Sequence, residues 1–365
     1  MIRRAALSLL LTVIAASGAD AARRRPVARP VPQTAIPAAA IDALASQAIA
    51  AGVPGISIAV SHGNAAYANG YGFTDSGKAN AVTPESIFQI ASVTKQFTAA
   101  AILALEEEGR LTTFDPVTQW IPELDLGGRL VTIEQLLTHT SGLRPGLELL
   151  VDPYSALDLA TAIELIEEHG FVAEPGTREE YNNGGYWLLG VVIERAAEMP
   201  YAQYLKERLF EPAGLRRTAY CGVAPASPVP AGFLQLGNAA VPVAPIDMSV
   251  AFAAGALCST ASDLVRWSDA LAAGMVISLA SYQKMIAPGR LADGSTLYYG
   301  LGVGLGTIEE RFATSHAGTI VGFESYLVHV PSERLAVAVL VNEVSNRADP
   351  GGIARAIARE ILAGP

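Results

Sequence analysis

Residues 88–109 read FQIASVTKQFTAAAILALEEEG, and they contain the strongest helix pattern in the chain. Alanine, leucine and isoleucine fill the segment from Ser92 to Glu108, and Gly109 ends it, so we predict a helix over these residues. Ser92 and Lys95 stand three positions apart at its start. On a helix, side chains at this spacing share one face.

The segments on either side of this helix predict a sheet assembled from both ends of the chain. Residues 36–51 have helical spacing, and residues 55–60 and 65–71 form the two strands of a predicted hairpin. Strand patterns return only near the C-terminus, before a last helix. These later elements are expected at residues 298–306, 311–315, 323–330, 335–341 and 350–362.

The middle of the chain has a mainly helical pattern. Thr132 and Gln135 form a capping box at the start of one of these helices. We therefore predict an α+β fold in which residues 38–114 and 288–365 form a discontinuous α/β sheet domain and residues 115–287 form an inserted helical domain, with a cleft between them. The inserted helices are expected near residues 132–139, 155–169, 184–198, 201–210 and 262–273.

The composition is that of a large acidic globular protein. The 365 residues are 51% hydrophobic and 16% charged, which supplies enough apolar material for a large core. The 35 acidic residues outnumber the 25 lysines and arginines and give a net charge of −10. Because this charge repels the phosphates of nucleic acids, we expect no nucleic acid partner.

The N-terminus has the layout of an export signal. Residues 1–21 contain two arginines, a short apolar run and the small residues ADA, so we predict a signal peptide that is cleaved near Ala21. Residues 22–37 are rich in arginine and proline and are interpreted as a stiff linker. No cysteine follows the cleavage site to accept a lipid, and no stretch is long enough to span a bilayer. We expect a secreted or periplasmic protein without a stable membrane anchor.

The two cysteines and the histidines are further candidates for a disulfide or a metal site. Cys221 and Cys258 fit either one disulfide or two free thiols, and the sequence does not choose between them. We interpret His139 as a structural histidine. Because the histidines outside residues 315–319 lack the spacing of metal ligands, we expect no metal and no other cofactor. These histidines are His62, His139, His169 and His329.

The pair Ser92 and Lys95 can carry chemistry. A serine at the electropositive start of a helix becomes a nucleophile if a neighbouring lysine, with its pKa lowered by burial, accepts the proton. The structural alternative is that Ser92 only caps the helix and Lys95 is only a surface cation. A second pair at the same spacing, Ser281 and Lys284, has no comparable strand, loop and helix around it and is interpreted as structural.

Two other motifs accompany the SVTK of residues 92–95. Residues 181–183 read YNN in a turn-rich loop before a helix, and residues 315–319 read SHAGT at the end of a strand. The three motifs, in this order and spacing, resemble those of the serine β-lactamase and penicillin-binding protein superfamily. The nearest branch resembles the class C β-lactamases with their related D-alanyl-D-alanine carboxypeptidases and esterases. The segment LLTHTSGL at residues 136–143 is also typical of that family.

The resemblance implies a fold and a set of roles. The fold is β-lactamase-like, with an antiparallel sheet flanked by helices and an inserted all-helical domain. Ser92 is implied as the nucleophile and Lys95 as its partner. Tyr181 would activate Ser92, as a phenolate or through a hydrogen bond to Lys95, and then protonate the leaving group. Asn183 would bind the substrate, and the backbone N–H groups of Ser92 and Thr319 would form an oxyanion hole.

The third motif departs from the Lys-Thr-Gly pattern of the family. His316 stands in place of lysine, and it can be cationic or donate a hydrogen bond. Ala317 stands in place of threonine, whose hydroxyl helps to hold the substrate carboxylate in penicillin-recognising members. His316 and Gly318 are carried over as substrate-binding positions. The missing hydroxyl favours an esterase or an amide hydrolase over a β-lactamase.

We therefore expect an exported serine hydrolase that forms an acyl-enzyme on Ser92 with a small ester, amide, peptide or β-lactam. An esterase and a D-amino-acid peptidase or amidase are the leading interpretations. A β-lactamase or D-alanyl-D-alanine carboxypeptidase is the alternative within the family, and a penicillin-binding cell-wall receptor without turnover is the alternative of another class. The loops at residues 145–153 and 224–245 are expected to shape the cleft. The oligomeric state is left open.

Overall fold

The computed structural model describes residues 36–221 and 229–364. The predicted signal peptide at residues 1–21, and the predicted linker up to residue 35, lie outside the described residues. Export therefore stays a prediction. Within the described ranges, no helix is long and apolar enough to cross a membrane.

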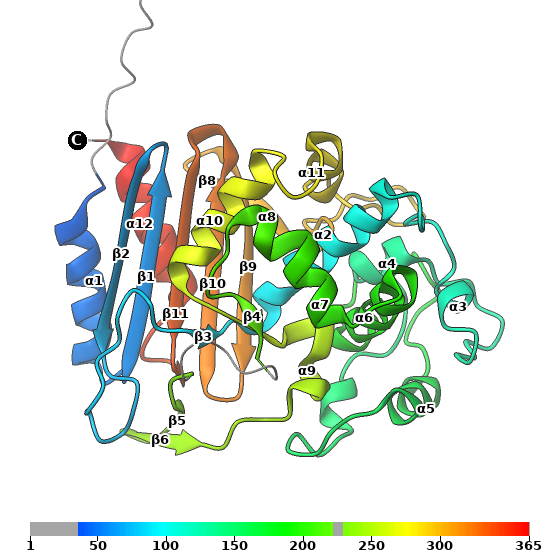
Figure 1. Cartoon of the computed structure of the whole chain (residues 1–365), viewed down its shortest axis with the longest axis horizontal. Helices are drawn as coiled ribbons and strands as arrows, with labels where there is room; N and C mark the ends of the chain where they lie inside the picture. Colours follow the sequence, from blue (N-terminus) through cyan, green and yellow to red (C-terminus); the bar gives the residue numbers. More distant parts are fainter. Residues whose placement is uncertain (1–35, 222–228, 365) are drawn as a thin grey trace, which may run out of the picture. The chain divides into compact units, whose positions relative to one another are not determined.

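A six-stranded antiparallel sheet forms the central layer (Figure 1). Two strands come from the N-terminal part of the chain and four from the C-terminal part, and the two groups meet where β1 pairs with β11. The register there sets Ile58 opposite Val339. In spatial order the strands are β2 (Ala65–Gly72), β1 (Gly55–His62), β11 (Leu335–Val341), β10 (Phe323–Val330), β9 (Arg311–Ile320) and β8 (Gly304–Ile308).

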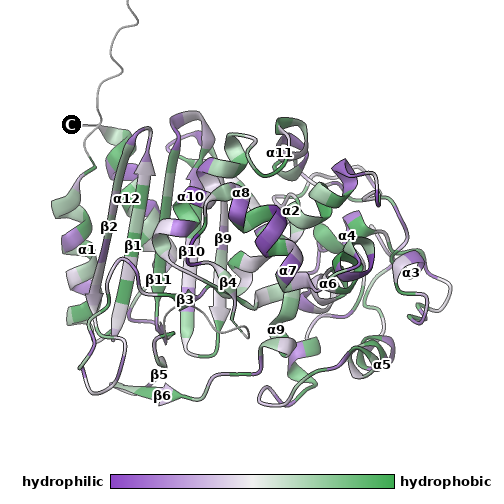
Figure 2. Ribbon diagram, viewed as in Figure 1, coloured by the Kyte–Doolittle hydropathy of each residue, from purple (hydrophilic) through white to green (hydrophobic). Residues whose placement is uncertain are grey.

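Helices from the two chain ends cover one face of this sheet. Helices α1 (Ala38–Ala50) and α12 (Pro350–Ala363) lie side by side on that face (Figure 1). Ile56, Ile58 and Val60 of β1 point to these helices and are fully buried, because side chains alternate between the faces of a strand. Strand β1 carries green, apolar bands in Figure 2.

The opposite face carries the larger core. There α10 (Ala261–Ala272) packs on β1 and β11, and α2 (Thr94–Glu107) runs through the centre of the molecule with almost every residue buried. The remaining helices are α3 (Val117–Trp120), α4 (Ile133–Leu137), α5 (Leu159–His169), α6 (Asn183–Ala197), α7 (Tyr201–Leu205), α8 (Glu211–Ala213), α9 (Met248–Gly255) and α11 (Leu279–Met285). Short helical turns are η1 (Ala91–Val93), η2 (Leu147–Leu149), η3 (Lys206–Phe210) and η4 (Pro331–Glu333).

Two small sheets were not predicted. Their strands are short, so they leave little periodic pattern in the sequence. One sheet has the order β3-β7-β4 and the other β12-β5-β6. Their strands are β3 (Phe88–Gln89), β4 (Ala219–Tyr220), β5 (Gly232–Leu236), β6 (Ala239–Val243), β7 (Leu257–Ser259) and β12 (Glu343–Val344).

The strand predicted at residues 298–306 was wrong in its first half. The strand β8 begins only at Gly304. Gly302 has a φ of +73°, and a Cβ atom there would lie 2.5 Å from the carbonyl oxygen of Lys95. The glycines therefore form a turn that packs closely against α2.

Several other predictions are confirmed. The hairpin of β1 and β2 and the capping box at Thr132 are present. Cys221 and Cys258 form a disulfide, with Cα atoms 5.1 Å apart, which settles the two alternatives that the sequence left open. The antiparallel sheet flanked by helices confirms the predicted fold class. The division into two domains at residues 115 and 288 stays a prediction.

Acidic side chains gather where β10, β12 and the start of α12 meet. Glu343 is fully buried and pairs with Arg347 at an N···O distance of 3.3 Å. Glu324 is half-buried, and its Oε2 atom has no hydrogen-bond partner in the described part of the chain. Burial, with the negative charges of Asp349 and Glu343, raises the pKa of the Glu324 carboxyl to about 7.

This carboxyl should make stability depend on pH. In the folded protein Glu324 keeps its proton up to about pH 7, whereas its ordinary pKa is 4.5. The contribution of the protonated Glu324 carboxyl to the free energy of unfolding is therefore fully present below pH 4.5 and is lost as the pH rises through 7. We expect Glu324→Gln, which is neutral at every pH, to raise the melting temperature at pH 8 but not at pH 4. Thermal unfolding followed by circular dichroism measures this, with Glu360→Gln on the exposed side of α12 as the control. An equal effect of both variants at both pH values would contradict the assignment.

Candidate active site

Ser92 lies in the tight turn η1, immediately before α2. The helix begins at Thr94 rather than at the predicted Ser92, and Ala91 has a φ of +46°. Val93 occupies the N-cap position, and Ser92 makes no capping hydrogen bond. The structural alternative for Ser92 is therefore absent, and its hydroxyl is free to face the Lys95 side chain, with Nζ 3.1 Å from Oγ.

Lys95 is fully buried and is surrounded by neutral oxygen atoms. Its Nζ atom lies 2.8 Å from Oδ1 of Asn183 and 2.9 Å from the carbonyl oxygen of Ala254, in addition to Ser92. No carboxylate in the described ranges forms an ion pair with it. Burial lowers the pKa of Lys95 to about 7, although the negative charge of Glu148 opposes this shift. Near neutral pH the amine is therefore often unprotonated.

The second Ser-x-x-Lys pair provides a contrast. Lys284 is partly exposed and forms an ion pair with Glu106 at 2.6 Å. The backbone N–H of Ser281 is capped by the Ser278 side chain at the start of α11. The structural interpretation of this pair is confirmed.

Tyr181 and Asn183 reach the same lysine from the start of α6. Nζ of Lys95 lies 4.8 Å from the centre of the Tyr181 ring. Burial raises the pKa of the Tyr181 phenol well above its ordinary value, and the adjacent Ser92 hydroxyl offsets only part of this rise. The phenol therefore stays protonated at neutral pH, so Lys95, and not a phenolate, is the group able to accept a proton from Ser92.

Glu148 is a member of the site that sequence analysis did not identify. Its Oε1 atom accepts a hydrogen bond of 3.0 Å from Nδ2 of Asn183. Glu148 belongs to η2, within the loop at residues 145–153 that was expected to shape the cleft. Position in that loop was the only signal in the sequence. The contact between the Ala254 carbonyl oxygen and Lys95 could not be predicted at all, because every residue has a backbone carbonyl and the sequence does not show where it lies.

Strand β9 forms the opposite wall. β8 pairs with β9 only as far as Ser315, so the later residues of β9 form a free edge beside Ser92. Ala317 and Thr319 line the space there. Gly318 points away from it, and a Cβ atom at this position would lie 2.4 Å from the Ile90 carbonyl oxygen. Gly318 therefore allows β9 to pack against the segment before Ser92, and it does not line the space.

His316 is neutral in this environment. Its Nδ1 atom lies 2.6 Å from the carbonyl oxygen of Ala317, which can only accept, so Nδ1 carries the proton. Nε2 then accepts a hydrogen bond of 2.9 Å from the Tyr299 hydroxyl. Burial and the charge of Lys95 lower the pKa of His316 to about 3. The sequence left open whether His316 is a cation or a neutral hydrogen-bond donor. In the structure it is the neutral donor.

Two hollows meet at Ser92. The larger, of about 500 Å³, is lined by polar and aromatic side chains, which include Tyr181, Tyr299 and His316. The smaller, of about 340 Å³, is mostly apolar, and Glu148 is its single charged residue. Its apolar lining includes Leu149, Pro153, Ile246, Val250, Ile320 and Val321. A substrate with its carbonyl carbon at Ser92 would place one part in each hollow.

His139 holds the loop that carries Tyr181. Its carbonyl oxygen accepts the N–H of Glu180 at 2.8 Å, and its Nδ1 atom accepts the N–H of Asn182 at 3.1 Å. Its ring centre lies 4.3 Å from that of Tyr181. The residue is buried, with a φ of +59°, and burial lowers the pKa of its imidazole well below the ordinary value. His139 therefore has the structural role that we predicted, and it plays this role within the site, by holding the loop of Tyr181.

Known proteins resemble this chain along most of its length. A model of the family described as Beta-lactamase matches residues 41–360. Penicillin-binding protein 4* of Bacillus subtilis is 30% identical over 308 residues, which are 79% of this chain and 68% of that protein. The octameric penicillin-binding protein homologue from Pyrococcus abyssi has a TM-score of 0.76 and 28% identity over 90% of this chain and 77% of its own. D-amino acid amidase from Ochrobactrum anthropi SV3 has a TM-score of 0.76 and 25% identity over 89% of this chain and 98% of its own.

The reactivity of Ser92 should follow the protonation of Lys95. We expect the rate of Ser92 labelling by a fluorophosphonate probe to fall about tenfold per pH unit below pH 7 and to level off above it, because only the neutral amine accepts the proton. Mass spectrometry of the labelled protein at successive times gives the rate. Glu148→Gln should move the midpoint to lower pH, because the negative charge of Glu148 raises the pKa of Lys95. A flat profile, or a midpoint near 10, would rule out Lys95 as the proton acceptor.

The hydrogen bond from Asn182 to His139 should stabilise the loop of Tyr181. In His139→Phe the ring remains, but the buried N–H of Asn182 loses its acceptor, which costs about 1–3 kcal/mol. In His139→Asn an acceptor remains, and asparagine tolerates the positive φ. We expect urea unfolding to show the larger loss of stability for His139→Phe. The opposite order of the two variants would show that ring packing, and not this hydrogen bond, holds the loop.

Proposed function

The chain belongs to the Beta-lactamase family and is a serine hydrolase, and from this premise we propose that it hydrolyses amides or esters of D-amino acids through an acyl-enzyme on Ser92. The observation that carries the proposal is the Glu148 carboxylate, which contacts Asn183 in the mostly apolar hollow beside the nucleophile. A carboxylate in this position favours a substrate with a positive charge next to its carbonyl carbon. An amino acid with a free α-ammonium group has such a charge.

The reaction would begin with proton transfer from Ser92 to Lys95. Two N–H bonds of the neutral amine can donate to Asn183 and Ala254, which leaves the nitrogen lone pair facing Oγ of Ser92 at 3.1 Å. Oγ then attacks the substrate carbonyl carbon. The backbone N–H groups of Ser92 and Thr319 would stabilise the oxyanion, and removal of one such donor in other enzymes costs about 3 kcal/mol.

Tyr181 would complete the first half of the reaction. As the tetrahedral intermediate collapses, the bond to the leaving amine or alcohol breaks, and the phenol donates its proton to that group. The resulting phenolate then takes a proton from the nearby Lys95 ammonium, whose Nζ lies 4.8 Å from the centre of the ring, and this transfer restores both the phenol and the neutral amine. Water, with its proton taken by the restored neutral Lys95, then attacks the acyl-enzyme. This step releases the acid and returns the proton to Ser92.

Charge argues against a β-lactam as the preferred substrate. A penicillin carries a carboxylate, which a cation or a hydroxyl on β9 would have to bind. Here Ala317 has no hydroxyl and His316 is neutral, so β9 offers the hydroxyls of Ser315 and Thr319 but no cation, while Glu148 adds a negative charge at the same cleft. The similarity to D-amino acid amidase supports the D configuration of the proposed substrate. The mostly apolar lining of the smaller hollow suits an apolar side chain on that substrate. An esterase acting on D-amino acid esters uses the same steps and is included.

Two further parts of the proposal come from the sequence. We propose that the protein is exported, because residues 1–21 have the layout of a signal peptide. We also propose that it turns over its substrate, because the restored neutral Lys95 beside Ser92 can take a proton from the water that attacks the acyl-enzyme. A penicillin-binding receptor without turnover would instead keep its acyl group.

Glu148 should select for the substrate ammonium group. We compare kcat/KM for D-phenylalanine amide with that for 3-phenylpropanamide, which lacks only the amino group. In Glu148→Gln the preference for the first over the second should fall about fivefold, the value of one exposed ion pair near 1 kcal/mol. Glutamine keeps an acceptor for the Asn183 amide, so the geometry of the site is retained.

Controls separate this prediction from the alternatives. Ser92→Ala should abolish hydrolysis of both amides without a change in melting temperature. Intact mass after incubation with benzylpenicillin should show no lasting adduct on the wild-type protein. An unchanged preference in Glu148→Gln would contradict the amino acid substrate, and a lasting penicilloyl adduct on Ser92 would favour the receptor.

A further inference from the structure

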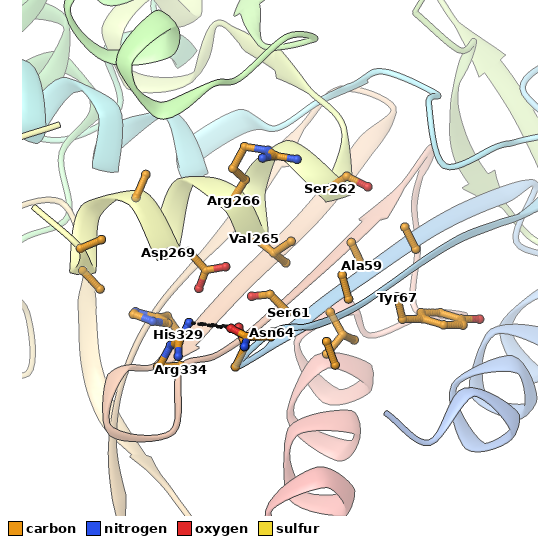
Figure 3. A pocket seen from close by; sticks show the side chains of 18 of the residues that line it. Ala59, Ser61, Asn64, Tyr67, Ser262, Val265, Arg266, Asp269, His329 and Arg334 are labelled. Atoms are coloured by element: carbon orange, nitrogen blue, oxygen red, sulfur yellow. Dashed lines mark hydrogen bonds between the residues drawn. The ribbon is translucent and has the colours of Figure 1, made fainter. Parts of the chain in front are cut away.

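A separate hollow of about 710 Å³ lies between α10 and the β1–β2 hairpin (Figure 3). It shares no lining residue with the two hollows that meet at Ser92. Its walls come from the start of β2, from one side of α10 and from the turn after β10. A ligand bound here would not touch the nucleophile.

The hollow exists because the sheet carries small side chains at this edge. The register places Ala59 opposite Ala68 and Ser61 opposite Ala66, and these four residues face the α10 side. On the other face of β1, bulky residues fill the space under α1 and α12. Helix α10 packs over β1 and β11, so the small side chains at the β2 edge leave an open floor.

One end of the floor carries two polar groups without strong partners. Ser61 is 7% exposed, and its buried hydroxyl lies close to the Asp269 carboxylate and to no other hydrogen-bond partner among the described residues. Asp269 is half-buried and forms no ion pair within the same described ranges. Figure 3 shows its carboxylate directed toward the Ser61 hydroxyl. Burial raises the pKa of Asp269, and the nearby hydroxyl and arginines offset only part of that rise. This carboxylate therefore lacks a full counter-charge.

A fixed guanidinium group lies at the same end. Nη2 of Arg334 donates to the Gly63 carbonyl oxygen at 3.2 Å and to Oδ1 of Asn64 at 3.4 Å, which holds the group at the hairpin turn (Figure 3). The charge of Arg334 lowers the pKa of Asp269, although the two do not form a direct ion pair. The space between them can therefore admit a ligand that contacts both.

The balance of charge restricts what that ligand can be. Arg266 also lies at the hollow, while His329 is neutral because burial lowers its pKa to about 4. A simple cation would meet the two arginines, and a simple anion would meet Asp269. A molecule with both an ammonium and a carboxylate group satisfies both ends at once.

We propose that this hollow binds a zwitterionic amino acid. The ammonium group is held by the Asp269 carboxylate, which the buried Ser61 hydroxyl positions, and the carboxylate by the Arg334 guanidinium. The side chain lies on the alanine floor, where burial of apolar surface adds to affinity. The site does not depend on the reaction at Ser92.

Methionine NMR can test the site directly. Met275 lines the hollow and is exposed, so its ¹³C-labelled methyl group reports on binding there. D-leucine is titrated against 4-methylpentanoate, which lacks the amino group, and 3-methylbutylammonium, which lacks the carboxylate. We expect D-leucine to shift the Met275 signal saturably and each analogue to bind at least about tenfold more weakly. Met199 and Met285 serve as internal references.

Variants separate this site from the active site. Asp269→Asn, which is nearly isosteric and removes one charge, should weaken the Met275 response about tenfold. Glu148→Gln alters the cleft at Ser92 and should leave the response unchanged, so failure of the substrate proposal and failure of this one are distinguishable. A Met275 signal that does not shift, equal binding of the two analogues and D-leucine, or an unchanged response in Asp269→Asn would overturn the proposal.

Discussion

The burial of one ammonium group organises the site. Nζ of Lys95 has no counter-ion within the described residues and is held by oxygen atoms from three separate segments: Ser92 in η1, Asn183 in α6 and Ala254 in α9. A buried charge with only neutral partners is costly, so the amine titrates near neutrality instead of near 10. The helices α2, α6 and α9 pack on one another around this point (Figure 1). The packing of these three helices therefore also sets the basicity of Lys95, because it buries the amine.

The same low-polarity surroundings set the states of the neighbouring groups. Burial keeps the rings of His139 and His316 neutral, and the Tyr181 phenol, with an ordinary pKa of 10 that its surroundings raise further, stays protonated. The positive charge of Lys95 reinforces the effect on both histidines. As a result, an acid and a base stand side by side at neutral pH, and Glu148 is the only full negative charge among the described residues that line the two hollows at Ser92. The contrast between this carboxylate and the neutral groups on β9 supports the proposed preference for a positively charged substrate.

The central sheet shapes both the active site and the separate hollow under α10. β9 extends beyond β8, and the glycine at 318 lets the extended part approach the turn that carries Ser92. At the far edge of the sheet, small residues on β1 and β2 leave a hollow under α10 instead of a filled core. Both features follow from residue size on one face of a strand. In one case a missing Cβ allows close packing, and in the other small side chains allow a cavity.

The features that depend on local pattern could be predicted from the amino-acid sequence. Alternation predicted the β1–β2 hairpin, helical spacing predicted α2 and α6, and the three motifs identified the residues that the structure gathers around Lys95. Only the tertiary structure decided the protonation states, the disulfide, the position of Glu148 and the carbonyl of Ala254 at the lysine. It also corrected the glycine segment before β8, where close contact with α2 replaced strand pairing. A pKa such as that of Lys95 depends on how deeply the group is buried, and a disulfide depends on the distance between two segments that are remote in sequence. Neither burial nor such a distance can be read from a local sequence pattern.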